Sequence, residues 1–99
     1  MKELDETNFN DFIKSEEKVL VDFYADWCGP CKVAHNILSK AEEKLQGRIA
    51  KINIDNNSDI TAKFGIRSIP TLIVFSDNVA LSKKTGIPKN TEEIEEMLK

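Results

Sequence analysis

Two kinds of local structure meet in Val19-Leu20-Val21-Asp22-Phe23-Tyr24-Ala25-Asp26-Trp27-Cys28-Gly29-Pro30-Cys31. The first six residues form a nearly continuous apolar run, which is typical of a strand buried on both faces of a sheet. After Cys31, Gly47 supplies a helix stop, and apolar residues recur before it at helical spacing: Val33, Ala34, Ile37, Leu38, Ala41 and Leu45. We therefore predict a buried strand that passes directly into a helix, with two cysteines at the junction.

Strands and helices are predicted to alternate on both sides of this junction. Upstream, Leu4 falls in a short edge strand, and a helix capped by Thr7 or Asn8 follows it. The buried face of that helix consists of Phe9, Phe12 and Ile13. Downstream, the pattern predicts a strand over 49–55, a short helix ending at Gly65, strands over 71–75 and 79–85, and a last helix behind a capping box at Asn90-Thr91-Glu92-Glu93.

The order of these elements defines the fold class. Parallel strands need crossover helices between them, whereas the tight turn Ser76-Asp77-Asn78 makes the last two strands an antiparallel hairpin. We expect an α/β fold with a central mixed β-sheet of four to five strands flanked by about four helices. Residues 1–99 are expected to form a single domain, because a chain of this length supports one core.

Composition and charge argue against several classes of partner. Fourteen Lys and Arg against seventeen Asp and Glu give a net charge of −3, so the chain offers no positive field to a nucleic-acid backbone. The first residues form no apolar stretch of signal-peptide type, and no run approaches the roughly 20 apolar residues that span a bilayer. The expectation is a cytoplasmic protein that binds neither nucleic acid nor a membrane.

Cys28 and Cys31 are the only two cysteines, and a reducing compartment argues against a purely structural disulfide between them. At positions i and i+3 of a helix, their Cβ atoms lie about 5 to 6 Å apart, so a reversible disulfide can form without refolding. The free N–H groups and the dipole at the helix start stabilise a thiolate on Cys28, lowering its pKa from about 8.5 toward roughly 7. Cys28 is the predicted nucleophile, and Cys31 is the thiol that resolves the mixed disulfide.

The residues around the cysteines favour a reductant. Gly29-Pro30 adds no positive charge beside Cys28, so the thiolate is only moderately stabilised and the dithiol form is a better reductant. The alternatives are idle thiols or a zinc half-site of Cys28, Cys31 and His35. No further Cys or His exists to complete a closed zinc site, so no metal is expected.

Asp22 interrupts the apolar strand, and a buried carboxylate must pair, become protonated or shift its pKa upward. If its strand lies under the helix start, Asp22 can take the proton from Cys31 during the resolving step, directly or through water. Lys51, on the neighbouring predicted strand, is its natural electrostatic partner. An exposed or merely paired Asp22 and a solvated Lys51 are the alternatives. The candidate catalytic residues are Cys28, Cys31, Asp22 and Lys51.

The pentapeptide Trp27-Cys28-Gly29-Pro30-Cys31, the upstream Asp22 and the downstream Ile69-Pro70-Thr71 together resemble the thioredoxin family. Residues 51–55 and Gly86 extend the resemblance over essentially the whole chain. It implies a thioredoxin fold and a protein-disulfide reductase whose only redox group is the Cys28–Cys31 pair, with no bound cofactor. It also implies disulfide-containing protein substrates, and a thioredoxin reductase that draws on NADPH or ferredoxin to recharge the dithiol. A monomer is expected.

The same resemblance implies a substrate site beside the cysteines. Ile69-Pro70 would be cis and face the sulfurs, so that the backbone of Ile69 could pair with an extended substrate strand. A shallow apolar patch would be rimmed by Trp27, Gly29, Pro30, Ile69, Pro70 and Gly86. Considered alone, Trp27 and Ile69 could equally belong to the core.

Several positions depart from the usual family pattern. Asn36 stands where these proteins usually carry a proline, so we expect a straighter active-site helix. The turn at Ser76-Asp77-Asn78 lacks the customary glycine, Tyr24 replaces a frequent Trp, and His35 is expected to be half-exposed. Two other functions stay open: a binding module that never cycles its thiols, and an oxidant or isomerase with a more acidic Cys28.

Overall fold

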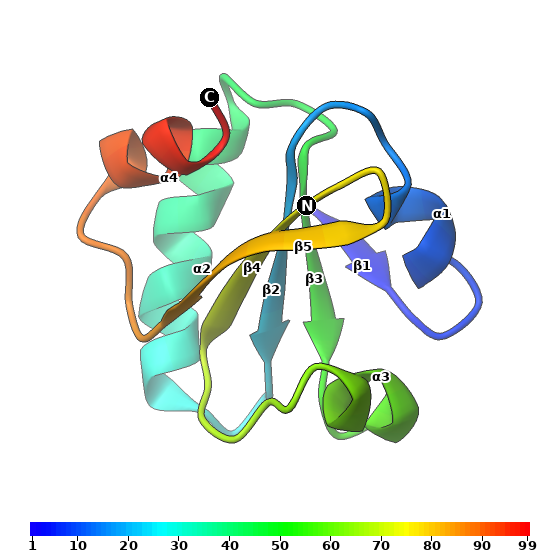
Figure 1. Cartoon of the computed structure of the whole chain (residues 1–99). Coiled ribbons are helices and arrows are strands. Elements are labelled where there is room, and N and C mark those ends of the chain that lie inside the picture. The colour runs from blue at the N-terminus through cyan, green and yellow to red at the C-terminus, as the bar shows by residue number, and fades with distance from the viewer.

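The computed structural model describes residues 1–99, which build a mixed sheet with helices on both faces (Figure 1). The strand order is β1-β3-β2-β4-β5. The strands are β1 (Lys2–Leu4), β2 (Val19–Tyr24), β3 (Ile49–Asn53), β4 (Thr71–Ser76) and β5 (Val79–Thr85). β3 runs parallel to both β1 and β2, whereas β4 runs antiparallel to β2 and to β5. The predicted α/β class and mixed sheet are confirmed.

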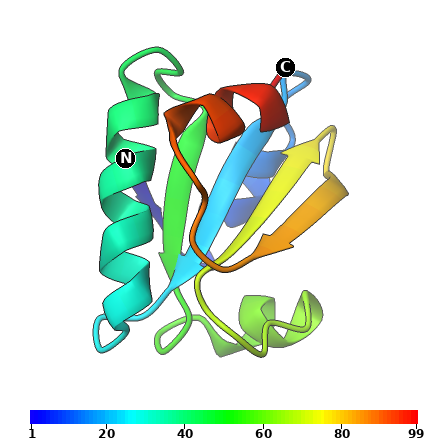
Figure 2. The ribbon, with the colours of Figure 1, turned by 90° about the vertical axis from the view of Figure 1, so that its left-hand side faces the viewer.

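Four helices cover the sheet, two on each face (Figures 1 and 2). They are α1 (Phe9–Ile13) and α3 (Ser58–Lys63) on one face, and α2 (Gly29–Glu42) and α4 (Thr91–Met97) on the other. Alternate strand residues point to opposite faces, so each face has its own core. Ten buried residues, among them Phe23 and Phe75, form the core under α1 and α3; eight, among them Leu20 and Leu38, form the core under α2 and α4.

Helix α2 ends at Glu42, earlier than the apolar pattern through Leu45 predicts. The N–H groups of Glu43, Lys44 and Leu45 donate to carbonyls three residues back, at 3.2, 3.1 and 3.0 Å. The chain therefore tightens into 3₁₀-type turns before Gly47, whose φ of +76° completes the reversal. Leu45 still packs against the core under α2 and α4, which explains why the sequence pattern extends beyond the helix.

The prediction that a side chain of Thr7 or Asn8 caps α1 was wrong. Asn8 occupies the N-cap position but makes no side-chain cap bond. Its amide oxygen instead accepts the N–H of Asp5 at 2.8 Å, and Asp5 Oδ1 accepts the N–H groups of Thr7 and Asn8 at 2.8 and 3.2 Å. The polar residues before the helix bond to one another, so the first turn of α1 receives no side-chain cap.

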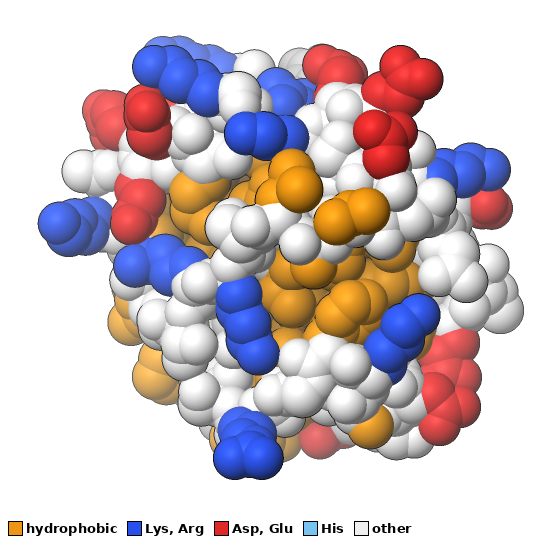
Figure 3. All heavy atoms as spheres, in the orientation of Figure 1, with side chains coloured by type: hydrophobic (Ala, Val, Ile, Leu, Met, Phe, Trp, Pro, Cys, Tyr) orange, Lys and Arg blue, Asp and Glu red, His pale blue; other side chains and the backbone are white.

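The predicted hairpin forms through a two-residue turn at Asp77-Asn78, with β4 and β5 paired from Ser76 and Val79. Asp77 and Asn78 adopt φ of +52° and +68°, a conformation that Asn and Asp tolerate better than other side chains, so no glycine is needed. β5 is an edge strand, and Val79 and Leu81 are half-exposed on it. Figure 3 shows hydrophobic side chains gathered in a hollow on this side of the molecule, with basic side chains beside them.

No helix is both long enough and apolar enough to cross a membrane.

Candidate active site at the start of helix α2

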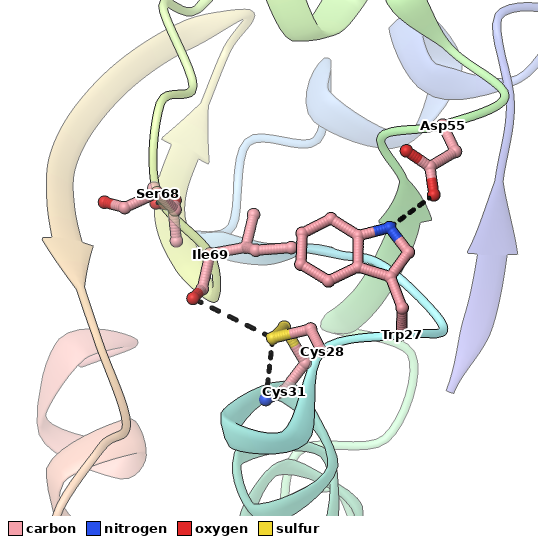
Figure 4. Close-up of a disulfide and its surroundings, with 7 residues drawn as sticks. Trp27, Cys28, Cys31, Asp55, Ser68 and Ile69 are labelled. Atoms are coloured by element: carbon pink, nitrogen blue, oxygen red, sulfur yellow. Dashed lines mark hydrogen bonds between the residues drawn. A yellow bond between two sulfur atoms is a disulfide. The ribbon is translucent and has the colours of Figure 1, made fainter.

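Cys28 and Cys31 form a disulfide at the amino end of α2 (Figure 4). Their Cα atoms are 5.3 Å apart, and both residues are buried. Cys28 is the N-cap residue with extended backbone, and its Sγ accepts the N–H of Cys31 at 3.1 Å. Pro30 lies in the first turn, where its missing N–H costs no hydrogen bond. The predicted position of the first cysteine, at a helix start that directs N–H groups to its sulfur, is confirmed.

The segment before β4 lies against the disulfide. Ile69 O is 3.9 Å from Cys28 Sγ (Figure 4), and the Ile69 side chain packs on the small cluster of Ala25, Cys28 and Cys31. The Ile69-Pro70 peptide bond is cis, as the family resemblance implied. Directly after β5, the N–H of Gly86 donates to the Pro70 carbonyl at 2.8 Å. Three segments far apart in the sequence therefore meet at the disulfide.

Trp27 lies on the surface beside the disulfide and is not part of the core. Its side chain is 70% exposed, and its Nε1 donates to Asp55 Oδ2 at 2.9 Å. This hydrogen bond fixes the indole ring across the end of β3, next to Ile69 (Figure 4). Trp27 therefore presents a large, oriented apolar surface to anything that approaches the sulfurs.

The other residues expected to rim a substrate patch lie around the same point with different exposure. Gly29 and Pro30 are exposed, Ile69 and Gly86 are half-buried, and Pro70 is buried. Because Pro70 is buried, it adds little accessible surface to the patch. The accessible apolar surface near the sulfurs consists mainly of Trp27, Pro30 and Ile69.

Asp22 is a buried carboxyl group in β2, with 1% of its surface exposed. It is two residues from Leu20, which belongs to the core under α2, so its side chain faces that helix. Neither of its oxygens has a hydrogen-bond partner. Burial raises the pKa of Asp22 to about 7, the charge of Lys51 opposes this rise, and the charge of Glu3 adds to it. The exposed and simply paired alternatives are ruled out, and Asp22 can exchange a proton near neutral pH.

Lys51 lies on the strand next to Asp22, as predicted, and is its register neighbour, but its ion pair is with another residue. Its Nζ is 3.7 Å from Glu3 Oε1 and 5.2 Å from the centre of the Tyr24 ring. Lys51 therefore acts on Asp22 through its field and not through a direct salt bridge.

His35 lies one turn beyond Cys31 and is half-buried, as expected. A cleft of about 290 Å³ brings it together with Tyr24, Cys31 and Lys51. Burial, and secondarily the charge of Lys51, lower the pKa of His35 below its ordinary value of 6.5, so the imidazole is neutral at physiological pH. No group of three or more His, Cys, Asp or Glu is placed to hold a metal ion.

Comparison with known proteins agrees with this geometry. Residues 1–99 match the family model described as Thioredoxin. A thioredoxin of Mycoplasmoides gallisepticum is 43% identical over 89 residues, which cover 88% of this chain and 87% of that protein. A thioredoxin of Pseudomonas aeruginosa is 42% identical over 78 residues, which cover 77% of this chain and 72% of that protein. The chain belongs to the thioredoxin family.

Solved thioredoxins share the fold of this family member. A mutant thioredoxin from Halobacterium salinarum superposes with a TM-score of 0.87 and 28% identity, covering 98% of this chain and 86% of that one. A thioredoxin from Malassezia sympodialis superposes with a TM-score of 0.85 at 23% identity, covering 98% and 88%, and shows the likeness of fold alone. Like other thioredoxins, the protein is a thiol–disulfide oxidoreductase, and its redox-active disulfide is Cys28–Cys31.

Compared with the usual thioredoxin pattern, the active-site helix contains Asn36 in place of a proline. The helix is unbroken from Gly29 to Glu42, with Asn36 exposed in its middle. An asparagine keeps the backbone N–H that a proline would lack, so the helix needs no kink at this position.

The sequence did not reveal Glu3 as a neighbour of the redox site. Its contact with Lys51 depends on the pairing of β1 with β3, in which register partners are 48 positions apart in the sequence. The only local signal is that Glu3 precedes the apolar Leu4 in a short strand and so points to the opposite face. That signal places the side chain on a face but does not name its partner.

Proposed function

We propose that this protein is a protein-disulfide reductase in which Cys28 attacks and Cys31 resolves. The observation that carries the proposal is the N-cap position of Cys28, whose sulfur accepts the N–H of Cys31. In the reduced protein the same N–H and the helix dipole stabilise a thiolate on Cys28. Cys31 lies within the first turn and donates its own N–H to Cys28 Sγ, so it receives no such stabilisation and is assigned as the resolving thiol.

The reaction takes place in two exchanges. The Cys28 thiolate attacks one sulfur of a substrate disulfide; a mixed disulfide forms, and the other substrate sulfur leaves as a thiolate that takes up a proton. Cys31 then loses its proton, and its thiolate attacks Cys28 Sγ. The Cys28–Cys31 disulfide forms, and the second substrate sulfur leaves and is protonated. Two electrons pass from the dithiol to the substrate.

Asp22 is the proposed proton acceptor for Cys31 in the second exchange, directly or through a water molecule. Its pKa of about 7 matches the operating pH, which is the condition for an effective general base. Its free oxygens and its position under α2 support this role. Lys51 modulates Asp22 from the adjacent strand.

The proposed substrate site is the surface of Trp27, Gly29, Pro30, Ile69, Pro70 and Gly86. An extended segment of a partner protein would lie against the exposed Trp27 and place its disulfide over Cys28. The Ile69 carbonyl, which is 3.9 Å from Cys28 Sγ, would border the bound segment on its other side.

Further features of the proposal follow from the family. Disulfide-containing proteins are the substrates, and a thioredoxin reductase returns electrons to Cys28–Cys31. Residues 1–99 act as one monomeric domain with no bound cofactor, and the reducing cytoplasm is the compartment in which a dithiol reductant of this kind works.

The direction of the reaction is tested by the midpoint potential of the Cys28–Cys31 pair, titrated in defined dithiol/disulfide buffers with Trp27 fluorescence and thiol alkylation as readouts. We expect a value near about −270 mV. A value above roughly −200 mV would assign the protein to the oxidants or isomerases. The absence of any reversible two-electron transition would favour a binding module.

The roles of the two cysteines are tested by trapping. Cys31→Ser should accumulate a stable mixed disulfide with a reducible protein substrate, because the attacking thiol remains and the resolving thiol is gone. Cys28→Ser is the matched control and should trap none. Equal trapping by both variants, or trapping only by Cys28→Ser, would reverse or abolish the assignment.

A further inference from the structure

Glu3, Lys51 and Asp22 form one row across three adjacent strands. Glu3 of β1 is the register neighbour of Lys51 in β3, and Lys51 is the register neighbour of Asp22 in β2. Register neighbours point to the same face of a sheet, so one ammonium group lies between two carboxyl groups under α2. The two carboxyls differ in burial, because Glu3 is exposed and Asp22 is buried.

Lys51 is bound to the outer carboxylate of this row. Its Nζ is 3.7 Å from Glu3 Oε1 and 5.2 Å from the centre of the Tyr24 ring. Tyr24 Oη donates to both oxygens of Glu3, at 2.8 and 2.9 Å. The Glu3 carboxylate is thus fixed by Tyr24 and in turn fixes Lys51. The inner carboxyl, Asp22, has no partner for either oxygen.

We propose that Glu3 is a positioning residue that holds the Lys51 ammonium at the β1 edge of the sheet and so leaves the Asp22 carboxyl free to exchange a proton with Cys31. The proposal rests on the role of Asp22 proposed above. In this proposal an exposed residue of β1, Glu3, controls a buried group two strands away, the carboxyl group of Asp22.

The physical reason is competition for one cation. A lysine that moved next to Asp22 would stabilise the carboxylate and make it a weaker base. Burial raises the pKa of Asp22 to about 7, Lys51 opposes the rise, and Glu3 supports it. Removal of the Glu3 charge should lower the pKa of Asp22 in two ways. It ends the repulsion between Glu3 and the Asp22 carboxylate, and it frees Lys51 to approach that carboxylate.

The other charged groups on this face do not replace Glu3. On α2, Cys31, Lys32 and the neutral His35 line the cleft beside Lys51. Asp26, which precedes α2, lines the same cleft but forms no ion pair with Lys51. The N-terminal ammonium of Met1 is paired with Glu42 at 2.9 Å. On the far side of β2, β4 places the apolar Leu72 next to Asp22, and Lys84 of β5 is paired with Glu93 at 3.3 Å. Glu3 is therefore the one carboxylate that binds Lys51.

The test measures the titration midpoint of Asp22 directly, from the ¹³C shift of its carboxyl carbon in the oxidised protein, where no thiol titrates. Glu3→Gln should lower the midpoint by about half a pH unit or more, and Lys51→Met should raise it. In the Lys51→Met background, Glu3→Gln should produce a markedly smaller shift than it does alone. Glu17→Gln changes an exposed glutamate in the segment between α1 and β2; it is the matched control and should leave the midpoint unchanged.

Two results would overturn the proposal. An Asp22 midpoint that does not move in Glu3→Gln would show that the contact with Lys51 has no effect on Asp22. A shift of the same size with and without Lys51 would show that Glu3 acts through its own charge alone and positions nothing.

A kinetic measurement separates this proposal from the role of Asp22 itself. In a stopped-flow assay, the reduced protein forms a mixed disulfide with a small chromogenic disulfide, and attack by Cys31 releases the second coloured thiol. Asp22→Asn should slow this release about tenfold or more above neutral pH, and Glu3→Gln should shift its pH profile toward lower pH. If Asp22→Asn releases the thiol at the normal rate while Glu3→Gln still moves the midpoint, the role of Asp22 is wrong and the positioning by Glu3 stands.

Discussion

Asp22 introduces an ionisable group into a strand that is otherwise apolar and buried. Its carboxylate has lost the hydrogen bonds of water and gained none from the protein, so ionisation is unfavourable in the folded state. The same burial that raises the pKa of Asp22 to about 7 also lowers the stability of the protein when this group is ionised. This conflict is expected at a functional residue, where chemistry and stability have opposite requirements.

The pH dependence of stability follows from the sign of this shift. The pKa of Asp22 is raised from 3.8 in the unfolded chain to about 7 in the folded state, so between these values the folded state holds a proton that the unfolded chain has lost. The free energy of unfolding therefore falls as the pH rises through this window. About three pKa units correspond to roughly 4 kcal/mol at most, since each unit is about 1.4 kcal/mol.

Asp22→Asn should remove this pH dependence of the free energy of unfolding. Relative to the unmodified protein, the variant should gain about 2–4 kcal/mol in its free energy of unfolding between about pH 4 and pH 8, measured by urea denaturation at each pH. The exposed Asp11→Asn is the control and should follow the unmodified protein. A constant difference between Asp22→Asn and the unmodified protein at all pH values would show that Asp22 does not titrate in this window.

At the scale of elements, helix α2 is responsible for the geometry of the site. Its first turn fixes the Cys28 sulfur at the N–H of Cys31, and its buried face places Leu38 and Ala41 over the sheet. The middle of the helix determines how straight it is, and this chain has Asn36 there in place of the usual proline. Because Asn36 is exposed, substitutions at this position change the backbone with little change in packing.

Two substitutions measure what the backbone at Asn36 contributes. Asn36→Pro should lower the free energy of unfolding by about 3 kcal/mol, because it removes a hydrogen bond of the helix interior and its ring clashes with the preceding turn. Asn36→Ala should raise it by about half a kcal/mol, the difference in helix propensity. Urea denaturation measures both. Equal stability of the proline variant and the unmodified protein would show that the helix can kink at this position at no cost.

At the scale of the whole molecule, one sheet supports two cores. β2 lies at its centre between β3 and β4, and all three strands contribute residues to both cores. Loss of packing on either face therefore destabilises the same strands. The edges behave differently: β5 is exposed along most of its length, and its apolar residues contribute to a surface hollow that is also lined by Lys63 and Lys83. The same leucine substitution should therefore lower the free energy of unfolding much more in a core than on the exposed edge strand.

A pair of leucines tests this expectation. Leu38→Ala should cost about 2–5 kcal/mol, since Leu38 is fully buried between α2 and the sheet. Leu81→Ala makes the same chemical change on half-exposed β5 and should cost less than about 1 kcal/mol. Both variants should unfold in one transition when followed by circular dichroism and by Trp27 fluorescence. Separate transitions would show that the two cores unfold independently.

The local features of the fold were predictable because short-range physics determines them. The strand over 19–24 and the cysteines at its junction with α2 follow from the apolar run and the helical spacing after Cys31. The cap of α4 is also local: Asn90 Oδ1 accepts the N–H of Glu93 at 2.9 Å, as the capping box predicts. The carboxylate of Glu93, however, accepts from Lys89 at 2.7 Å, one residue outside the predicted box. Element ends were less accurate: backbone 3₁₀-type turns end α2 three residues before Leu45, and β3 ends two residues before the predicted end, where the Asp55 N–H donates to Asn53 Oδ1.

The sequence by itself determined where the redox chemistry lies, at two cysteines one turn apart at a helix start, and it singled out an aspartate in the strand before them for the proton transfer that we propose. Those assignments rest on spacing along the chain, and spacing is enough because the groups lie on one continuous strand and helix. Only the tertiary structure decided that Trp27 is exposed, that Gly86 bonds to Pro70, and that Lys51 is bound to Glu3. Each of these depends on strands that pair across dozens of residues, and the burial that raises the pKa of Asp22 exists only once the sheet and α2 have closed over it.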